Sequence, residues 1–283
     1  TLTHSSNRLT LADSDELAFG TGSDLRIYHN GTNSNIENFG GTFSLNNSTL
    51  SGNSAIQGVG RGGAIYNRGV GTISNSTLSG NSASSGGGIY NYGGNVNNPG
   101  GTLNIANTII ANSTSGGSTP APIDDYAGGG TVNLVSPSTA ANNLVSQGTF
   151  SWATTKTSAE INLGSLANNG GPTQTLALLT GSVAIGAGDA TISNAAPVNG
   201  LDQRGINRTT SDIGAYSFGI QVTTTADTVD SDPNVTSLRE AITLANSSPG
   251  NDVIVFNLTG VNTITLGSAL PTIVSASTVV GSG

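Results

Sequence analysis

The chain of 283 residues contains no cysteine. Neither disulfide bonds nor thiolate metal sites can hold it together, so its stability has to come from packing and hydrogen bonding. Charged residues make up only 8% of the chain, where about 25% is usual. Aromatic residues are scarce as well, at 5%, whereas glycine is abundant, with 41 residues. This composition differs from that of an ordinary enzyme domain and favours β structure rich in turns.

Basic residues are few. The chain has 8 Lys and Arg against 16 Asp and Glu, which gives a net charge of −8. Because the basic residues are scattered, a face that binds nucleic-acid phosphates is not expected. No apolar run approaches the roughly 20 residues of a membrane-spanning helix. No charged and then apolar leader follows Thr1, so we expect the chain to be an excerpt from a longer protein.

Repeats organise the middle of the chain. Phrases that begin with Gly-Thr open short β-type runs at Gly41, Gly71 and Gly101, thirty residues apart. Residues 48–55 return unchanged as residues 76–83. Each repeat has to bury its apolar residues against its neighbours. The repeats therefore predict an all-β fold, a right-handed parallel β-helix with roughly 20 to 30 residues in each turn.

Equivalent residues of successive turns are expected to stack about 4.8 Å apart. The motif Gly-Gly-Ala-Ile-Tyr-Asn at 62–67 returns as Gly-Gly-Gly-Ile-Tyr-Asn at 86–91, which predicts a row of tyrosines and a row of asparagines. We expect all of the stacked residues to have a structural role. They are Leu50, Ile65, Tyr66, Asn67, Leu78, Ile89, Tyr90, Asn91 and Ile109, with Ile110 as the alternative to Ile109.

Three parts are predicted along the chain. Residues 1–40 form a small β segment, in which Asn30-Gly31 indicates a hairpin turn. Residues 41–218 contain the β-helix repeats and a closing region. Residues 219–283 are expected to begin a second β-helix module.

Two stretches of the middle part resemble known families of surface proteins. The repeat Asn-Ser-Thr-Leu-Ser-Gly-Asn-Ser, at 47–54 and 75–82, resembles those of polymorphic outer-membrane-type proteins. Asn-Asn-Gly-Gly-Pro-Thr-Gln-Thr at 168–175, followed by Asp-Gln-Arg-Gly at 202–205 and Asp-Ile-Gly-Ala-Tyr at 212–216, resembles the choice-of-anchor Q region. These resemblances imply a β-helix on a bacterial surface.

This chain departs from the choice-of-anchor Q pattern at two positions. Leu176 stands where that family commonly has His, and Gly186 stands where it often has Asp. A catalytic role for these positions is therefore not expected. The polar residues left in the closing region are predicted to form structural ion pairs or to accept backbone hydrogen bonds. These residues are Asp189, Asp202, Arg204 and Asp212.

Two further resemblances concern the ends of the chain. Residues 222–256, with Ser-Leu-Arg-Glu-Ala at 237–241, resemble the domain named for Cys-Ser-Leu-Arg-Glu-Ala, although Thr236 replaces the Cys. In such proteins this segment begins a β-helix, so a module boundary is expected near residues 218–221. Residues 11–31 resemble segments of phage tail-fibre proteins.

Ser237 and Glu240 have the spacing of a capping box, in which each side chain bonds the backbone N–H of the other residue. A short helix is therefore predicted near residues 237–246, with Leu238 and Ile242 on its apolar face. We expect that face to cover an open end of a β-helix. The strands predicted after the helix are 253–256, 263–266 and 272–274.

One oxygen-rich segment suggests a cation. Asp227, Asp230, Asp232 and Asn234 place four oxygen ligands within eight residues, and calcium prefers such ligands. The glycine and the distal glutamate of a helix-loop-helix calcium site are missing. A solvated acidic turn is the simpler explanation, and no other cofactor is expected.

Glycan-cleaving β-helix enzymes need an acid and a base along one sheet face. Between residues 41 and 112 the only charged residues are Arg61 and Arg68, so the repeats supply neither. The sequence predicts a non-enzymatic, exported β-helical adhesin or stalk, extracellular or on the cell surface. Its expected partners are surface glycans or other surface proteins. A tail-fibre component and a glycan-cleaving enzyme are the alternatives, and the oligomeric state is left open.

Overall fold

The structure is a computed structural model in which most of the chain is described. The described residues are 3–5, 8–10, 16–19, 25–29, 34–56, 60–96, 99–116, 122–169, 171–179, 181–206, 208, 211–229, 236–247, 253–256, 258, 263–274 and 278–280.

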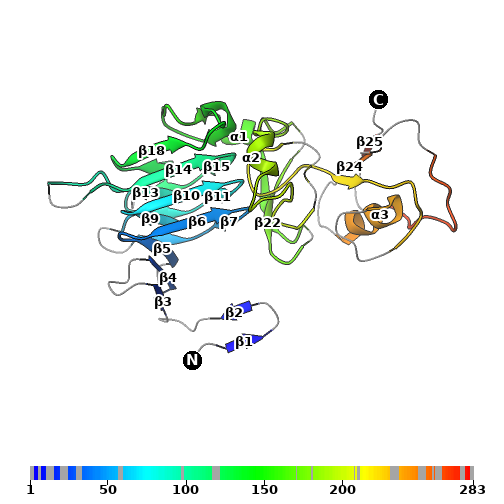
Figure 1. The fold of residues 1–283 in the computed structure, drawn as a ribbon, viewed down its shortest axis with the longest axis horizontal. Helices are drawn as coiled ribbons and strands as arrows, with labels where there is room; N and C mark the ends of the chain where they lie inside the picture. The colour runs from blue at the N-terminus through cyan, green and yellow to red at the C-terminus, as the bar shows by residue number, and fades with distance from the viewer. Residues whose placement is uncertain are drawn as a thin grey trace.

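The central part of the chain is a parallel β-helix of about three turns (Figure 1). The predicted fold class is therefore confirmed. The front sheet contains β6 (Thr42–Asn46), β10 (Val70–Ser74), β14 (Thr102–Ala106) and β18 (Thr131–Leu134). The second sheet contains β7 (Thr49–Ser51), β11 (Thr77–Ser79), β15 (Thr108–Ala111), β19 (Asn143–Val145) and β20 (Thr154–Thr155).

Two further sheets complete each turn. The short sheet contains β8 (Ser54–Ala55), β12 (Ser82–Ala83) and β16 (Thr114–Ser115). The tyrosine sheet contains β5 (Ser34–Asn38), β9 (Ile65–Asn67), β13 (Ile89–Asn91) and β17 (Tyr126–Ala127), and it continues into β4 (Leu25–His29) and β3 (Glu16–Phe19). Because β5 pairs in parallel with β9, the β-helix begins before the expected boundary at residue 40.

The verbatim repeat sets the register of the turns. Leu78 pairs with Leu50, 28 positions earlier. The Gly-Thr phrases, which recur every thirty residues, do not pair with one another. Gly71 pairs with Phe43 on one side and with Leu103 on the other. A Cβ at Gly71 would lie 2.5 Å from a ring carbon of Phe43 and 2.9 Å from Leu103. Gly71 therefore makes room in the core for the Phe43 ring.

Inward-facing apolar residues stack from turn to turn. Leu50, Leu78 and Ile110 form one row, and Ile65 pairs with Ile89 in another. Ile65, Leu78 and Ile89 are fully buried, whereas Leu50 in the first turn is half-buried.

The expected place of Ile109 in this row was wrong. Side chains alternate along a strand, so when Ile110 points inward its neighbour points outward. Ile109 pairs with Thr77 on the outer face and is buried there against the closing region. The alternative residue, Ile110, takes the inward position.

A second row inside the β-helix is polar. Asn38, Asn67 and Asn91 are fully buried and follow one another in register. The amide of Asn38 donates to Oδ1 of Asn67 at 2.9 Å, and the amide of Asn67 donates to Oδ1 of Asn91 at 2.9 Å. Asn67 also donates to the carbonyl of Gly69 at 3.1 Å. The row thus joins three turns and satisfies backbone groups at the corner.

The closing region covers the outer face of the second sheet and not only the end of the β-helix (Figure 1). Its regular elements are η1 (Ala140–Asn142), α1 (Ser158–Ile161), β21 (Leu163–Ala167), β22 (Thr175–Leu178) and α2 (Ala190–Asn194). Corner asparagines in the left-handed conformation bind it. Asn75 donates to the Ser193 hydroxyl at 2.9 Å, and Asn107 donates to the Asp189 carbonyl at 2.9 Å.

The end of the apolar core is covered by aromatic rings. Tyr126 pairs with Ile89 in the last turn, and its ring lies 5.4 Å from that of Phe150 and 5.1 Å from that of Trp152. Both rings pack against the core cluster of the β-helix. They cover the apolar end of the stack.

The C-terminal part forms a unit of its own. The strands β23 (Ile220–Val222), β24 (Val253–Phe256) and β25 (Thr278–Val280) make a parallel sheet, and α3 (Leu238–Ser247) packs on it. The capping box is confirmed, since the Ser237 amide donates to Glu240 at 2.8 Å and the Glu240 amide donates to the Ser237 hydroxyl at 3.2 Å. No described helix is long and apolar enough to cross a membrane.

The apolar face of α3, which includes Ile242 and half-buried Leu238, packs on the β23–β25 sheet and belongs to a cluster separate from the core of the preceding β-helix. One expectation about this unit was wrong, because residues 263–266 and 272–274 form no strand. Val274 is 74% exposed, so the second segment lacks the burial that a core strand requires. The third strand of the sheet is instead β25.

The remaining strands lie at the N-terminus. β1 (Thr3–Ser5) and β2 (Arg8–Thr10) form an antiparallel pair. β3, β4 and β5 also pair antiparallel, so the expected hairpin joins β4 to β5, although its turn at Asn30-Gly31 lies outside the described residues.

Replacement of Ile89 by Asp is expected to lower the free energy of unfolding by about 4 kcal/mol or more, because it places an unpaired charge in a dry core. Ile89 is fully buried. Thr131→Asp, at an exposed position of β18, is the control and should change stability by about 0.5 kcal/mol or less. Chemical denaturation measures both. Equal stability of the two variants would contradict the stacked core.

Candidate functional site

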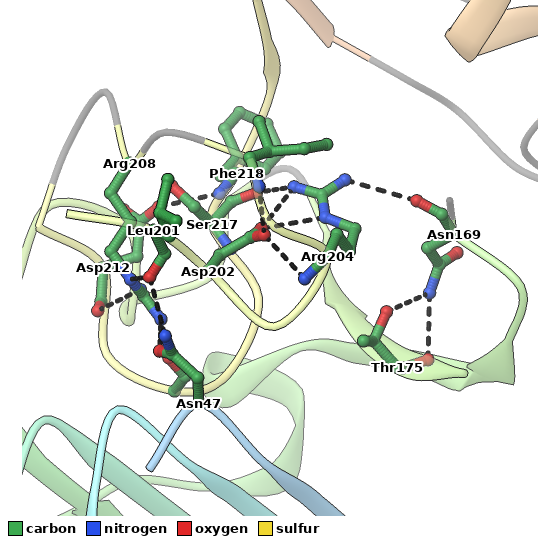
Figure 2. A network of polar contacts seen from close by, with 12 residues as sticks. Asn47, Asn169, Thr175, Leu201, Asp202, Arg204, Arg208, Asp212, Ser217 and Phe218 are labelled. Carbon is green, nitrogen blue, oxygen red and sulfur yellow. Dashed lines mark hydrogen bonds and ion pairs between the residues drawn. The ribbon is translucent and has the colours of Figure 1, made fainter. Parts of the chain in front are cut away.

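Two acidic residues of the closing region, Asp202 and Asp212, take part in a buried polar network (Figure 2). The Asp202 carboxylate accepts from Nε of Arg204 at 2.8 Å and lies 2.7 Å from Nη2. Both side chains are almost fully buried, at 0% and 1% exposure. Asp202 also accepts from the backbone N–H of Ser217 at 3.1 Å. The pair therefore has the partners that a buried charge requires.

Two arginines connect this network to the rest of the fold. Arg204 lies 3.8 Å above the ring of Tyr216 and donates to the carbonyl of Ser217 at 2.7 Å. Burial lowers its pKa, but the charges and hydrogen bonds of Asp202 and Tyr216 together outweigh burial and raise the pKa overall. Arg208 donates to Asn47 at 3.1 Å, which joins the network to the first turn (Figure 2). Burial lowers the pKa of Arg208.

Asp212 and Asp189 bind backbone N–H groups. Asp212 accepts from Gly186 at 2.7 Å and from Phe218 at 2.7 Å. Asp189 caps α2 by accepting from the amides of Thr191 and Ile192. Asp202 thus forms an ion pair with Arg204, while Asp189 and Asp212 accept hydrogen bonds from backbone N–H groups. Of the three, Asp202 and Asp212 are buried.

Asp125 is a further buried acid, and its pKa is raised by burial. A raised pKa often marks a functional group. Here both carboxylate oxygens are occupied by donors from neighbouring turns. They accept from the amide of Ser113 at 3.0 Å, from the amide and hydroxyl of Ser146 at 2.7 and 2.6 Å, and from the amide of Gln147 at 3.1 Å. Asp125 thus links residues of neighbouring turns through hydrogen bonds.

The predicted calcium segment is only partly described. Asp230, Asp232 and Asn234 lie outside the described residues. Both oxygens of Asp227 are bound by Arg239, at 2.8 Å each, and the pKa of Asp227 is lowered mainly by this contact. Within the described part of the chain, no three His, Cys, Asp or Glu side chains gather as metal ligands.

Two hollows of similar size open on the surface. One, of about 260 Å³, lies between the front sheet and the α2 segment and is lined by Ser44, Thr72, Ile192 and Pro197 among others. The other, of about 290 Å³, lies at the corner of the front and tyrosine sheets. Phe39, Arg68, Val70, Pro99 and Thr102 contribute to its lining. Among the described residues that line them, neither hollow has an acid.

The second hollow adjoins a row of aromatic rings on the tyrosine sheet. Tyr66 and Tyr90 are paired in register, with ring centroids 5.8 Å apart. Phe39 extends the row, with its ring 5.9 Å from that of Tyr66. β9 and β13 lie across the front sheet from the closing region, which leaves this side uncovered by it (Figure 1).

Both arginines of the repeats lie on this row. The guanidinium carbon of Arg61 is 4.9 Å from the ring centre of Tyr90, and that of Arg68 is 4.9 Å from the ring centre of Tyr92. Burial raises the pKa of Tyr66, and the charges of Arg68 and Arg61 offset part of the rise. We call this surface the aromatic face. It consists of Phe39, Arg61, Tyr66, Arg68, Tyr90 and Tyr92.

Sequence reasoning placed Tyr66 and Tyr90 in a structural row but did not bring the two arginines to them. A signal was present, because Arg61 and Arg68 directly flank the motif Gly-Gly-Ala-Ile-Tyr-Asn at 62–67. Phe39 and Tyr92 lie in other turns, and only the register of the β-helix adds them.

Comparisons with protein-family models, with curated proteins and with solved structures found no match. The function therefore has to be argued from the residues themselves.

Replacement of Asp202 by Asn is expected to lower the free energy of unfolding by about 3 to 5 kcal/mol, because it leaves the buried charge of Arg204 unpaired. The control is Lys156→Gln, which breaks the exposed pair with Glu160, 3.4 Å long, and should have a far smaller effect. Denaturation curves compare the two variants. A stable Asp202→Asn protein would mean that the ion pair does not support the closing region.

Proposed function

We propose that this chain is a non-enzymatic module of an exported surface protein, a β-helical stalk or adhesin that acts outside the cell or on its surface. The observation that carries the proposal is that the acidic side chains are already bound by other groups of the fold. Each carboxylate described between residues 34 and 247 has a partner within the fold. These acids are Glu37, Asp124, Asp125, Glu160, Asp189, Asp202, Asp212, Asp227 and Glu240.

Acids held in this way are poorly placed for catalysis. A general acid or base must reach the substrate and exchange a proton near the working pH. Asp202 and Asp212 are buried and accept hydrogen bonds, and the hollows on the surface are lined without an acid among the described residues. These observations favour a protein that binds other surfaces over one that cleaves a polysaccharide.

The geometry also suits a stalk. Parallel turns stack through backbone hydrogen bonds and extend the molecule along one axis, and further turns can be added at either end of such an array. The resemblances to bacterial surface proteins at residues 47–82 and 168–216 support the same proposal. A tail-fibre component is the second candidate, supported by the resemblance of residues 11–31 alone.

A panel of uronic-acid and neutral polysaccharides tests the catalytic alternative. We expect no release of reducing ends or unsaturated sugars after long incubation, because each acid described between residues 34 and 247 is already bound by a partner within the fold. Turnover of any polymer by the purified chain would contradict the proposal.

Antibodies against the chain test its location. Labelling of intact source cells is expected, whereas labelling of phage particles alone would favour the tail fibre.

A further inference from the structure

We propose that the aromatic face binds acidic polysaccharides, in which successive sugar rings carry carboxylates. The inference rests on the proposed function as a contact module and names the ligand that this module would take.

The rings supply the first part of the recognition. Tyr66 and Tyr90 stand side by side on neighbouring strands, and Phe39, 36% exposed, continues the row. Each ring is partly exposed. Aromatic side chains offer a broad apolar surface, and Tyr adds a polar hydroxyl at its tip. A sugar has the same mixture, with apolar C–H faces and hydroxyl groups around the ring edge. A row of such side chains therefore suits a chain of sugars.

The arginines supply the charge. Arg61 and Arg68 are the only basic residues between positions 41 and 155, and both lie over rings of the aromatic face. Among the described residues, neither forms an ion pair. Stacking occupies the flat side of a guanidinium and leaves its N–H edge for other partners. At Arg61 the Tyr66 hydroxyl takes part of that edge. That edge matches a carboxylate through two parallel hydrogen bonds.

The charge pattern singles out this face. The chain as a whole carries a net charge of −8, yet the two cations of the repeats occupy one side of the β-helix. Glu37 is the acid beside them, paired in register with Tyr66, and it has a partner of its own. A local positive field attracts anions even when the protein is acidic overall.

The hollow of about 290 Å³ provides a pocket for one sugar unit of the polymer. Arg68 and Phe39 belong both to its lining and to the aromatic face. Thr102 can contribute a hydroxyl to the lining, and Val70 and Pro99 contribute apolar surface. A uronic-acid unit in this hollow would place its carboxylate at Arg68 and direct the rest of the polymer along the rings.

An extended peptide fits this surface less well. Peptides often bind sheets by adding a strand to an unpaired edge. β9 and β13 are interior strands, since β5 and β17 already pair with their outer edges. The backbone of the aromatic face therefore has no free edge to offer, and recognition must come from side chains.

The test uses the 283-residue chain and immobilised polygalacturonate, with binding measured by biolayer interferometry. Polygalacturonate in which the carboxylates are methyl esters is the matched ligand without charge. We expect the native chain to bind the acid form at least tenfold more tightly than the ester. Raised salt should weaken binding to the acid form, because salt screens exposed charges.

Variants locate the binding. Arg61→Gln with Arg68→Gln should weaken binding at least tenfold, and Tyr66→Ala with Tyr90→Ala should do the same. Tyr66→Phe with Tyr90→Phe keeps the rings and should bind within about threefold of the native chain. Lys156→Gln removes a cation that lies just before α1 and outside the aromatic face, and it should have no effect. Unchanged thermal unfolding of the arginine variant shows that its loss is not a loss of fold.

The inference is overturned if polygalacturonate is not bound, if its ester is bound equally well, or if the arginine variant binds like the native chain. Retention of neutral polymers by the arginine variant would overturn the inference and leave the proposed function standing. Cleavage of the polymer would instead contradict the proposed function.

Discussion

The rest of this structure depends on the stacking of equivalent residues in successive turns. Each strand of an interior turn has its backbone paired with the turns before and after it, so a shift in one strand would displace the others. The apolar rows accommodate side chains of different size, because the small Gly71 leaves room for the large Phe43 ring beside it. The asparagine row tolerates less, because the amides of Asn38, Asn67 and Asn91 hydrogen-bond in one direction through a buried space. That row ties the register of the tyrosine sheet to the corner that leads to the front sheet.

The two surfaces that matter for function follow from this stack. Corner asparagines repeat on the second sheet and bind the closing region, in which Asp202 and Arg204 form a buried ion pair (Figure 2). On the tyrosine sheet the same repetition places rings side by side and leaves them partly exposed, with an arginine at either end of one repeated motif. One face is thus used for stability, and the other is the surface for which we propose a ligand.

Local repetition made most of the β-helix predictable from the sequence. Residues 48–55 and 76–83 are identical, and their pairing follows directly. The helix α3 was predictable too, since its capping box lies within four residues. What could not be predicted depends on contacts between distant segments. The outward position of Ile109 depends on the register of β15, and the lateral place of the closing region depends on Asn47, Asn75 and Asn107 meeting residues about 80 to 160 positions away. The rings of Phe150 and Trp152 that cover the end of the core belong to no repeat.

The most direct test of the stack compares two asparagines by chemical denaturation. Asn67 is buried and hydrogen-bonds both neighbouring turns, whereas Asn104 lies on the outer face of β14, half-buried, with bonds of 3.5 and 3.2 Å to the neighbouring side chains. Asn67→Ala should lower the free energy of unfolding by about 3 kcal/mol or more, because it leaves several buried polar groups unpaired. Asn104→Ala should cost about 1 kcal/mol or less. If both variants lose the same small amount, the buried row does not hold the register, and the account is wrong at its centre.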